Sequence, residues 1–254
     1  MSGHSKWAGI KHKKAVVDAR RGQIFTKVAM ELTVSAREGG ADPAGNFRLR
    51  LAMQKAREVN MPADNIERAI QRGAGGKEGE SLVEVRYEGY GPHGVAVMVD
   101  VVTDNRNRTV AAIRNLFTRS GGSLGETNSV GWMFTNQGVI HVDPKGKDPE
   151  AMAIDLMEVV DVGSDGDIGV DGGAVQVVMA PSRFEAVRHG LEQAGCTIES
   201  AEVTMNPSTS VPLDAAQARS VIRLLDGLEE LDDVQQVYAN AEIPDDVLES
   251  VAQD

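Results

Sequence analysis

The spacing of the apolar residues first changes from a helical to a strand-like pattern next to a run of glycines that begins at Gly73. Before the glycines, apolar residues recur every third or fourth position, which is typical of amphipathic helices. After them, alternating or continuous apolar runs such as residues 95–102 are typical of strands. We therefore predict an α+β protein in which a helical domain precedes two mixed α/β domains.

The helical domain is predicted to span residues 1–78 and to contain three short helices. Ile24, Val28 and Leu32 lie four residues apart and indicate the first helix. Residues 1–22 have no apolar stripe, so we expect them to form a tail that is mobile when unbound. This domain is therefore expected to be a basic arm followed by a helical bundle.

The rest of the chain is predicted to form two α/β domains, one inserted into the other. After a strand near residues 130–134, residues 135–205 are expected to follow the order strand, helix, strand, strand, helix, strand, which is that of the ferredoxin-like fold. The helix and strand that come later need a sheet, and the half-domain before the insertion has an open one. We therefore expect a discontinuous domain of residues 79–134 plus 206–254.

Charge is distributed unevenly along the chain. Residues 1–78 hold 15 Lys and Arg against 8 Asp and Glu, whereas residues 132–254 hold 6 against 24, within a net charge of -12. Such asymmetry predicts a polyanion such as nucleic acid as the partner of the basic end. The acidic end is expected to face solvent or a basic protein surface.

The N-terminal segment has the composition of a nucleic-acid-binding arm. Its cations can displace counterions from phosphates, and an aromatic side chain can stack on an unpaired base. The alternative is a solubilising tail whose Trp7 packs on the bundle. The candidate binding residues in this segment are His4, Lys6, Trp7, Lys11, His12, Lys13, Lys14, Arg20, Arg21 and Lys27.

A second candidate contact lies at residues 104–109, DNRNRT, where a strand is predicted to meet a helix. Amides at the start of a helix favour an anion, so Arg106 and Arg108 could bind phosphate oxygens while Asn107 reaches a base or sugar. The alternative is a helix cap followed by two surface arginines paired with nearby carboxylates. The sequence leaves both interpretations open.

Enzymatic, metal-binding and membrane functions have little support in the sequence. The string GYGPHG at 89–94 precedes a strand, whereas a dinucleotide site needs a helix there, so it predicts a turn. The acidic residues of 161–171 lack EF-hand spacing, and neither the histidines nor the single Cys196 form a metal-ligand pattern. Without an apolar stretch long enough to span a membrane, we expect a soluble, cytoplasmic protein that is not an enzyme and has no cofactor or metal.

Several strings of the chain resemble the YebC family. They are GHSKW at 3–7, IKHKK at 10–14, RGQIFTK at 21–27, NMP at 60–62, YEGYGP at 87–92, DNRNRT at 104–109, GGSLG at 121–125 and DDVQ at 232–235. The resemblance implies a helical N-terminal domain, two mixed α/β domains and a non-enzymatic cytoplasmic protein. One departure is Gln23, where many relatives have lysine.

Two roles are proposed within that family, a DNA-binding transcription factor and a ribosome-associated factor that helps the peptidyl-transferase centre through difficult sequences. Its mitochondrial relative is a translational activator of cytochrome c oxidase. In this chain we find no clear helix-turn-helix, which duplex reading usually requires. A lysine-rich arm with one tryptophan suits RNA, which is bound mostly through shape and single strands.

We therefore predict a monomeric, ribosome-associated translation factor that binds ribosomal or transfer RNA through its basic N-terminal region and assists peptide-bond formation at difficult sequences. A DNA-binding transcriptional regulator is the alternative, and a protein-binding adaptor is the second alternative.

Overall fold

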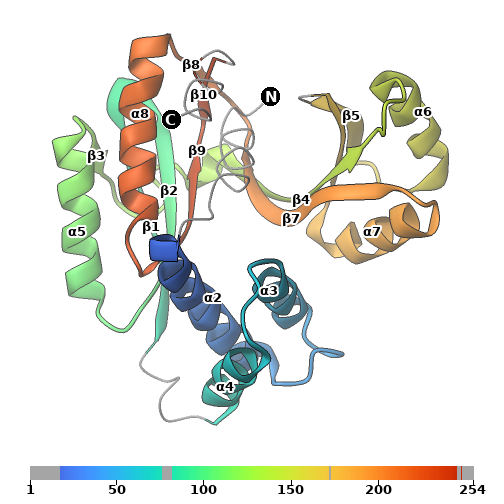
Figure 1. The fold of residues 1–254 in the computed structure, drawn as a ribbon. Helices are drawn as coiled ribbons and strands as arrows, with labels where there is room; N and C mark the ends of the chain where they lie inside the picture. The colour runs from blue at the N-terminus through green and yellow to red at the C-terminus, as the bar shows by residue number, and fades with distance from the viewer. Residues whose placement is uncertain (1–17, 76–81, 172, 245–246, 248–254) are drawn as a thin grey trace. The chain divides into compact units, whose positions relative to one another are not determined.

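The structure is a computed structural model that describes residues 18–75, 82–171, 173–244 and 247. The chain divides into two compact units, which we call the inserted unit, residues 133–208, and the main unit, the described residues on both sides of it. The predicted α+β class is confirmed, with a helical N-terminal region followed by two four-stranded antiparallel sheets (Figure 1).

The helical region of the main unit consists of α2 Asp18–Gly39, α3 Phe47–Glu58 and α4 Ala63–Ala74. Helices α3 and α4 both pack against α2. Buried side chains from all three helices, among them Leu32, Leu49 and Ile66, form a common core. Asn46 begins α3 by accepting a hydrogen bond from the Leu49 amide at 3.0 Å, which is the usual role of an N-cap residue.

Helix α2 starts earlier than the sequence indicates. It begins at Asp18, whereas a tail was predicted up to residue 22. The Arg21 guanidinium lies over the Phe25 ring, 5.5 Å from its centre, at the i,i+4 spacing at which helical side chains meet. This contact supports an additional turn that has no apolar stripe to reveal it.

The sheet of the main unit has the strand order β3-β1-β2-β9, and all its neighbours are antiparallel. Its strands are β1 Val83–Tyr90, β2 Ala96–Thr103, β3 Ser123–Leu124 and β9 Val234–Ala239. Strand β9 follows the inserted unit in the sequence, so the sheet is completed by residues from both sides of the insertion. A second, two-stranded parallel pair is formed by β8 Val211–Pro212 and β10 Ala241–Glu242.

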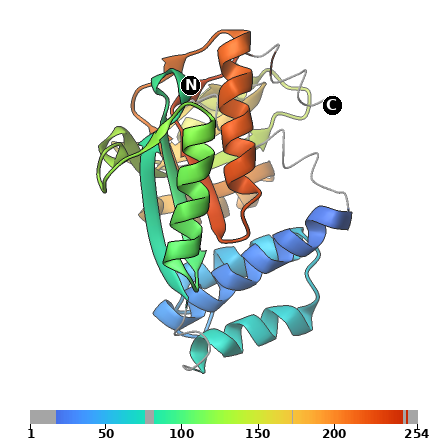
Figure 2. The same ribbon diagram turned by 90° about the vertical axis from the view of Figure 1, so that its left-hand side faces the viewer.

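Two helices, α5 Arg106–Arg119 and α8 Ala215–Glu229, lie side by side on one face of this sheet (Figure 2). Val99, Phe117 and Leu224 are fully buried between the helices and the strands. We call this part of the main unit, residues 82–132 and 209–244, the α/β body. Its core holds both ends of the discontinuous chain together, because α8 and β9 supply many of its buried side chains.

The inserted unit has the ferredoxin-like topology, with the strand order β5-β6-β4-β7. Its elements are β4 Phe134–Asp143, α6 Pro149–Val159, β5 Asp167–Asp171, β6 Ala174–Met179, α7 Phe184–Gln193 and β7 Thr197–Pro207. Ile140, Val177 and Phe184 are fully buried in its core.

The structure corrects the prediction of a strand near residues 130–134. Gly131–Met133 form a short 3-10 helix, η2, and β4 begins only at Phe134. The Val130 and Gly131 amides donate hydrogen bonds to the carboxylate of Glu88, at 2.9 and 2.6 Å. Bound in this way, these amides are not available to pair with a neighbouring strand.

Helices α2 and α4 approach closely at Gly73. A Cβ atom there would lie 2.1 Å from the carbonyl oxygen of Thr33 and 3.0 Å from the Cβ atom of Ala36. Gly22, also helical, would place a Cβ atom with nothing within 4 Å. The two glycines therefore differ in whether a methyl group fits.

We predict that Gly73→Ala destabilises the protein by roughly 1–3 kcal/mol, because the backbones of α2 and α4 must separate. Gly22→Ala should instead stabilise it by about 0.5–1 kcal/mol, since alanine favours helix. Urea unfolding of both variants measures the difference. Equal midpoints for Gly73→Ala and the unchanged protein would contradict the packing described here.

Candidate nucleic-acid interface

Seven of the ten candidate residues of the N-terminal arm lie outside the described residues. They are His4, Lys6, Trp7, Lys11, His12, Lys13 and Lys14. Of the other three, Arg20 lies in the first turn of α2, and Arg21 is exposed one residue later. Lys27, a turn and a half farther along α2, is only partly exposed.

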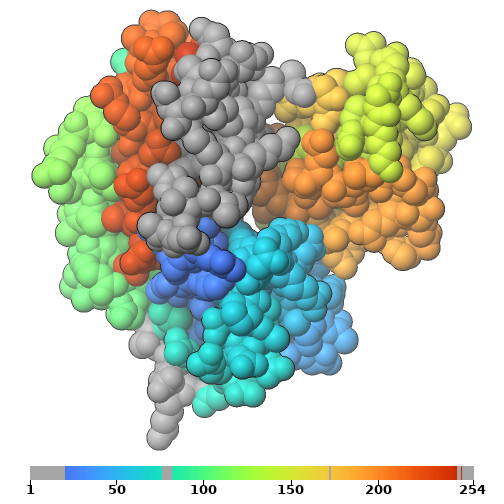
Figure 3. All heavy atoms as spheres, viewed as in Figure 1, coloured from blue at the N-terminus to red at the C-terminus, as the bar shows by residue number. Residues whose placement is uncertain are grey.

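Lys27 contacts the protein itself. Its ammonium group donates a hydrogen bond to the carbonyl oxygen of Glu229, and the Gln23 side-chain amide donates to the carbonyl oxygen of Glu230. Both oxygens lie at the C-terminal end of α8, where carbonyls lack helical partners and a positive charge is favourable. Helix α2 is thus attached to the end of α8 (Figure 3), a role for Lys27 that the sequence did not predict.

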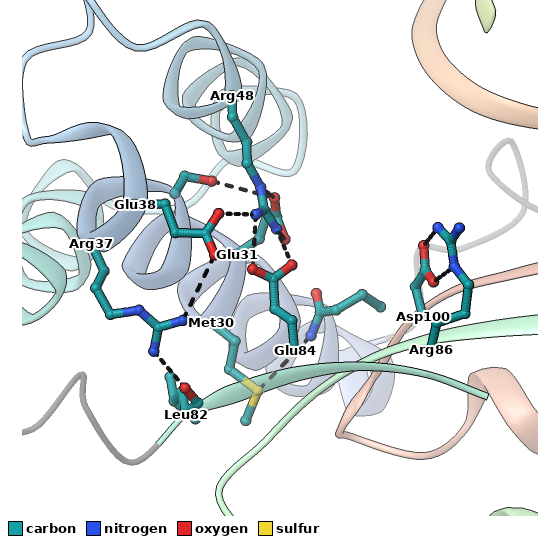
Figure 4. Close-up of polar contacts among 11 residues, drawn as sticks. Met30, Glu31, Arg37, Glu38, Arg48, Leu82, Glu84, Arg86 and Asp100 are labelled. Atoms are coloured by element: carbon teal, nitrogen blue, oxygen red, sulfur yellow. Dashed lines mark hydrogen bonds and ion pairs between the residues drawn. The ribbon is translucent and has the colours of Figure 1, made fainter. Parts of the chain in front are cut away.

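A second attachment is made by Arg48 of α3. Its guanidinium forms ion pairs with Glu31 at 2.8 Å, Glu38 at 2.7 Å and Glu84 at 2.7 Å (Figure 4). Glu31 and Glu38 belong to α2 and Glu84 to β1, so one side chain connects two helices to the sheet. Beside it, Arg37 donates to the carbonyl oxygen of Leu82 at the start of the α/β body.

The acid groups around Arg48 respond differently to their surroundings. Burial is the largest single influence on Glu84 and would raise its pKa, but the hydrogen bonds with Arg48 and Glu38 and the positive charges of Arg48 and Arg37 together leave that pKa below its ordinary value. Burial and the neighbouring Glu84 raise the pKa of Glu38. Burial would lower the pKa of Arg48, yet its hydrogen bonds to Glu84 and Glu31 raise it. Arg48 therefore keeps its positive charge, but the three carboxylates around it balance that charge. Its guanidinium is not available to bind a ligand.

Other cations of the helical region face solvent. Arg57 is exposed and Lys55 partly exposed, both in the last turn of α3. Within the described residues neither of them has an ion-pair partner. Together with Arg21 of α2 and with Arg68 and Arg72 of α4, which are also exposed, they keep positive charge accessible on the described helical region.

In the segment 104–109, some side chains bind other parts of the protein and others are exposed to solvent. Asn105 caps α5 by accepting a hydrogen bond from the Arg108 amide at 3.1 Å. The Arg108 side chain pairs with Asp104 at 2.8 Å and Asp233 at 3.0 Å, and these hydrogen bonds raise its pKa. For Arg108 the structure therefore agrees with the alternative interpretation, in which a helix cap is followed by surface arginines paired with nearby carboxylates. Arg106 and Asn107 are exposed in the first turn of α5.

Asp233 is the centre of a network that the sequence strings did not connect. Its carboxylate accepts hydrogen bonds from the hydroxyls of Thr103 at 3.1 Å and Thr109 at 2.5 Å, in addition to Arg108. Its carbonyl oxygen accepts from the Val102 amide at 2.9 Å. Residues 104–109 and 232–235, far apart in the sequence, thus form one structural unit at the start of α5.

A cleft of about 750 Å³ lies beside this network. It is lined by Thr26 and Met30 of α2, Arg72 of α4, Arg108 of α5 and Asp232. Because cations and carboxylates both line it, the cleft lacks the uniform positive charge expected of a phosphate site.

The motifs that the sequence analysis set aside have structural roles. Within the string at 89–94, Gly89 and Tyr90 end β1, and the residues that follow form the predicted turn to β2, with His93 and Gly94 at φ 62° and 77°. In the part of the chain that the structure describes, no group of three side chains is placed to hold a metal ion. No helix among the described residues is long and apolar enough to cross a membrane.

The sequence is similar to a defined family along nearly its full length. Residues 5–76 match the TACO1/YebC protein N-terminal domain, and residues 82–241 match the TACO1/YebC second and third domain. A "Probable transcriptional regulatory protein" of Shewanella oneidensis is 51% identical over 251 residues, covering 99% of this chain and 100% of that protein. A protein of the same name from Dictyoglomus thermophilum is 47% identical over 253 residues, with coverage of 99% and 100%.

A solved structure has the same fold. The crystal structure of a conserved hypothetical protein from Aquifex aeolicus superposes with a TM-score of 0.79 at 45% sequence identity. The match covers 91% of this chain and 93% of that one.

The Arg48 connection yields a pH-dependent prediction. Because the folded-state pKa of Glu84 is lowered, its stabilising contribution is complete above its unfolded-state pKa of about 4.3 and is lost as the pH falls through the folded value. We expect Glu84→Gln to cost about 1 kcal/mol or less near pH 7, since the pair is partly exposed, and almost nothing near pH 2.

Urea unfolding at both pH values tests this expectation. Glu67→Gln is the control, because Glu67 is exposed on α4 and has no ion pair among the described residues. A Glu84→Gln cost that stays the same at low pH would show that the ion pair with Arg48 does not produce it.

Proposed function

Because this chain belongs to the TACO1/YebC family, we propose that it is a non-enzymatic, nucleic-acid-binding regulator of gene expression. More specifically, we propose a ribosome-associated translation factor of the cytoplasm. It binds ribosomal or transfer RNA through residues 2–27, apart from Lys27, which is bonded to α8, and through nearby cations of the helical region, and it assists peptide-bond formation at difficult sequences.

The observation that carries this proposal is the separation of charge between the two ends of the chain. Residues 1–78 hold 15 Lys and Arg against 8 Asp and Glu, and the inserted unit holds 4 against 13. A phosphate backbone is attracted to the first and repelled by the second. Arg21, Lys55 and Arg57 extend the accessible positive charge from the arm onto α2 and α3.

The packing of the helical region supports RNA over duplex DNA. Four residues, 59–62, join α3 to α4, a length found in helix-turn-helix motifs. However, α3 and α4 pack mainly against α2, whereas the two helices of that motif pack against each other. A transcriptional regulator that reads DNA through α4 remains the second candidate, favoured by the short connection and by the exposed Gln71 and Arg72.

Replacing Lys11, Lys13 and Lys14 with glutamine should flatten the dependence of log affinity on log salt. The slope should change by about 2 to 3, since each lost phosphate contact contributes roughly 0.7–0.9. Replacing Arg119, Lys145 and Lys147 with glutamine removes the same charge elsewhere and should leave the slope unchanged. Filter binding of ribosomal RNA at several salt concentrations measures both, and equal slopes for the two triple variants would refute the role of the arm.

The kind of nucleic acid is decided by a competition between ribosomes and duplex promoter DNA at one salt concentration. We expect ribosomes to win, and co-sedimentation with ribosomes to fall when residues 1–22 are removed. Tighter, sequence-selective binding of DNA would favour the transcriptional regulator. Complexes that survive nuclease treatment intact would favour the protein-binding adaptor.

A further inference from the structure

Two exposed aromatic side chains of the main unit meet at one carbonyl oxygen. Trp132 is 72% exposed, the highest value for a large apolar side chain among the described residues, and Tyr90 is 37% exposed. The Trp132 indole N–H donates to the carbonyl oxygen of Ser129 at 3.3 Å, and the Tyr90 hydroxyl donates to the same oxygen at 3.4 Å. The polar groups of both rings are thus directed to the protein, while much of their apolar surface stays open to solvent.

Tyr90 ends strand β1, and the loop that leads to Trp132 is anchored by a buried acid. Glu88 of β1 is 4% exposed, and its carboxylate accepts hydrogen bonds from the amides of Asn128 at 3.0 Å, Val130 at 2.9 Å and Gly131 at 2.6 Å. A buried carboxylate is costly unless it is hydrogen-bonded, so these charge-assisted bonds hold the loop firmly. A Cβ atom at Gly131 would lie only 3.1 Å from the Glu88 carboxylate, which shows how closely the loop approaches it.

The anchoring makes Trp132 and Tyr90 a prearranged surface. A ligand that binds to side chains already held in place loses less conformational entropy than one that must order them. Exposing an indole to water is unfavourable, and tryptophan and tyrosine are enriched where proteins bind partners. The two rings are exposed but held in place, as expected of side chains that bind a partner.

We propose that Tyr90 and Trp132 form a platform on which unpaired bases of RNA stack. This inference rests on the proposed RNA-binding function. Planar bases stack on aromatic faces, and this contact tolerates any base. Glu126, one of several exposed residues of the loop, is acidic and does not attract phosphates, so the contact that we propose for the platform is with bases. It thus differs from the basic arm in the type of contact that it makes.

The first test uses the fluorescence of Trp132. The chain has two tryptophans, so Trp7→Phe leaves Trp132 as the sole indole. We expect a single-stranded oligoadenylate to quench this emission in parallel with its binding, measured by the anisotropy of a labelled strand. A duplex RNA of the same length should bind without quenching. Binding of the single strand with unchanged Trp132 emission would overturn the platform and leave the proposed function intact.

The second test separates stacking from charge. In the same background, Trp132→Ala should weaken single-strand binding by about 5- to 100-fold at every salt concentration, with an unchanged salt slope. Trp132→Phe should recover part of the loss, because a smaller ring still stacks. Ile154→Ala removes another exposed apolar side chain, 65% exposed on α6, and should change nothing.

The outcomes of this test are distinct. An unchanged affinity for Trp132→Ala, or a flattened slope, would contradict stacking on the platform while the arm keeps its role. If the unchanged protein binds no single-stranded or ribosomal RNA at any salt concentration, the proposed function fails, and the platform fails with it. Loss of a protein partner by Trp132→Ala at unchanged RNA affinity would also overturn the platform, since it would assign the rings to a protein contact.

Discussion

The attachment of the helical region to the α/β body determines which positive charges of this protein are left for a ligand. Lys27 is bonded to the end of α8, and Arg37 to the start of the body. Arg48 is surrounded by three carboxylates. These basic side chains hold the main unit together. A basic composition therefore overstates the available charge, which in the described helical region is carried by exposed or partly exposed side chains such as Arg21, Lys55, Arg57, Arg68 and Arg72.

Acidic residues of the α/β body serve as internal hydrogen-bond acceptors. Asp233 joins the start of α5 to the turn before β9, and Glu88 fixes the loop that ends at Trp132. Glu84 accepts Arg48 in the same way at the opposite end of β1. These carboxylates are satisfied by amides, hydroxyls and guanidinium groups, so burial does not leave their charge uncompensated. They position the residues that lie on the surface around them.

The order of elements could be predicted from the sequence because periodicity is a local signal. The succession of strands and helices predicts the ferredoxin-like unit, and the strand that follows it is expected to join the other sheet because the half-domain before the insertion has an open one. The start of α2 was missed because its first turn is polar and is supported by the Arg21–Phe25 contact. The strand expected near residue 132 was wrong because a distant carboxylate, Glu88, binds the amides that would have paired.

Long-range side-chain contacts left no pattern that could be read in advance. The strings at 104–109 and 232–235 were both noticed, but nothing in either indicates that Arg108 pairs with Asp233. The sequence places Lys27 with the arm, because composition does not distinguish a cation that bonds to the end of another helix from one in solvent. Trp132 lies in an apolar run, VGWMF, which predicts a strand and does not indicate an exposed side chain. Its exposure depends on the loop geometry, which only the fold defines.

The central claim is that the basic front of the chain, and not its acidic inserted unit, meets the nucleic acid. Ultraviolet crosslinking of the full-length protein to ribosomes, followed by mass spectrometry of the crosslinked peptides, tests it most directly. We expect crosslinks in residues 1–75 and at Tyr90 and Trp132, with none in 133–208. Crosslinks confined to the inserted unit would contradict it.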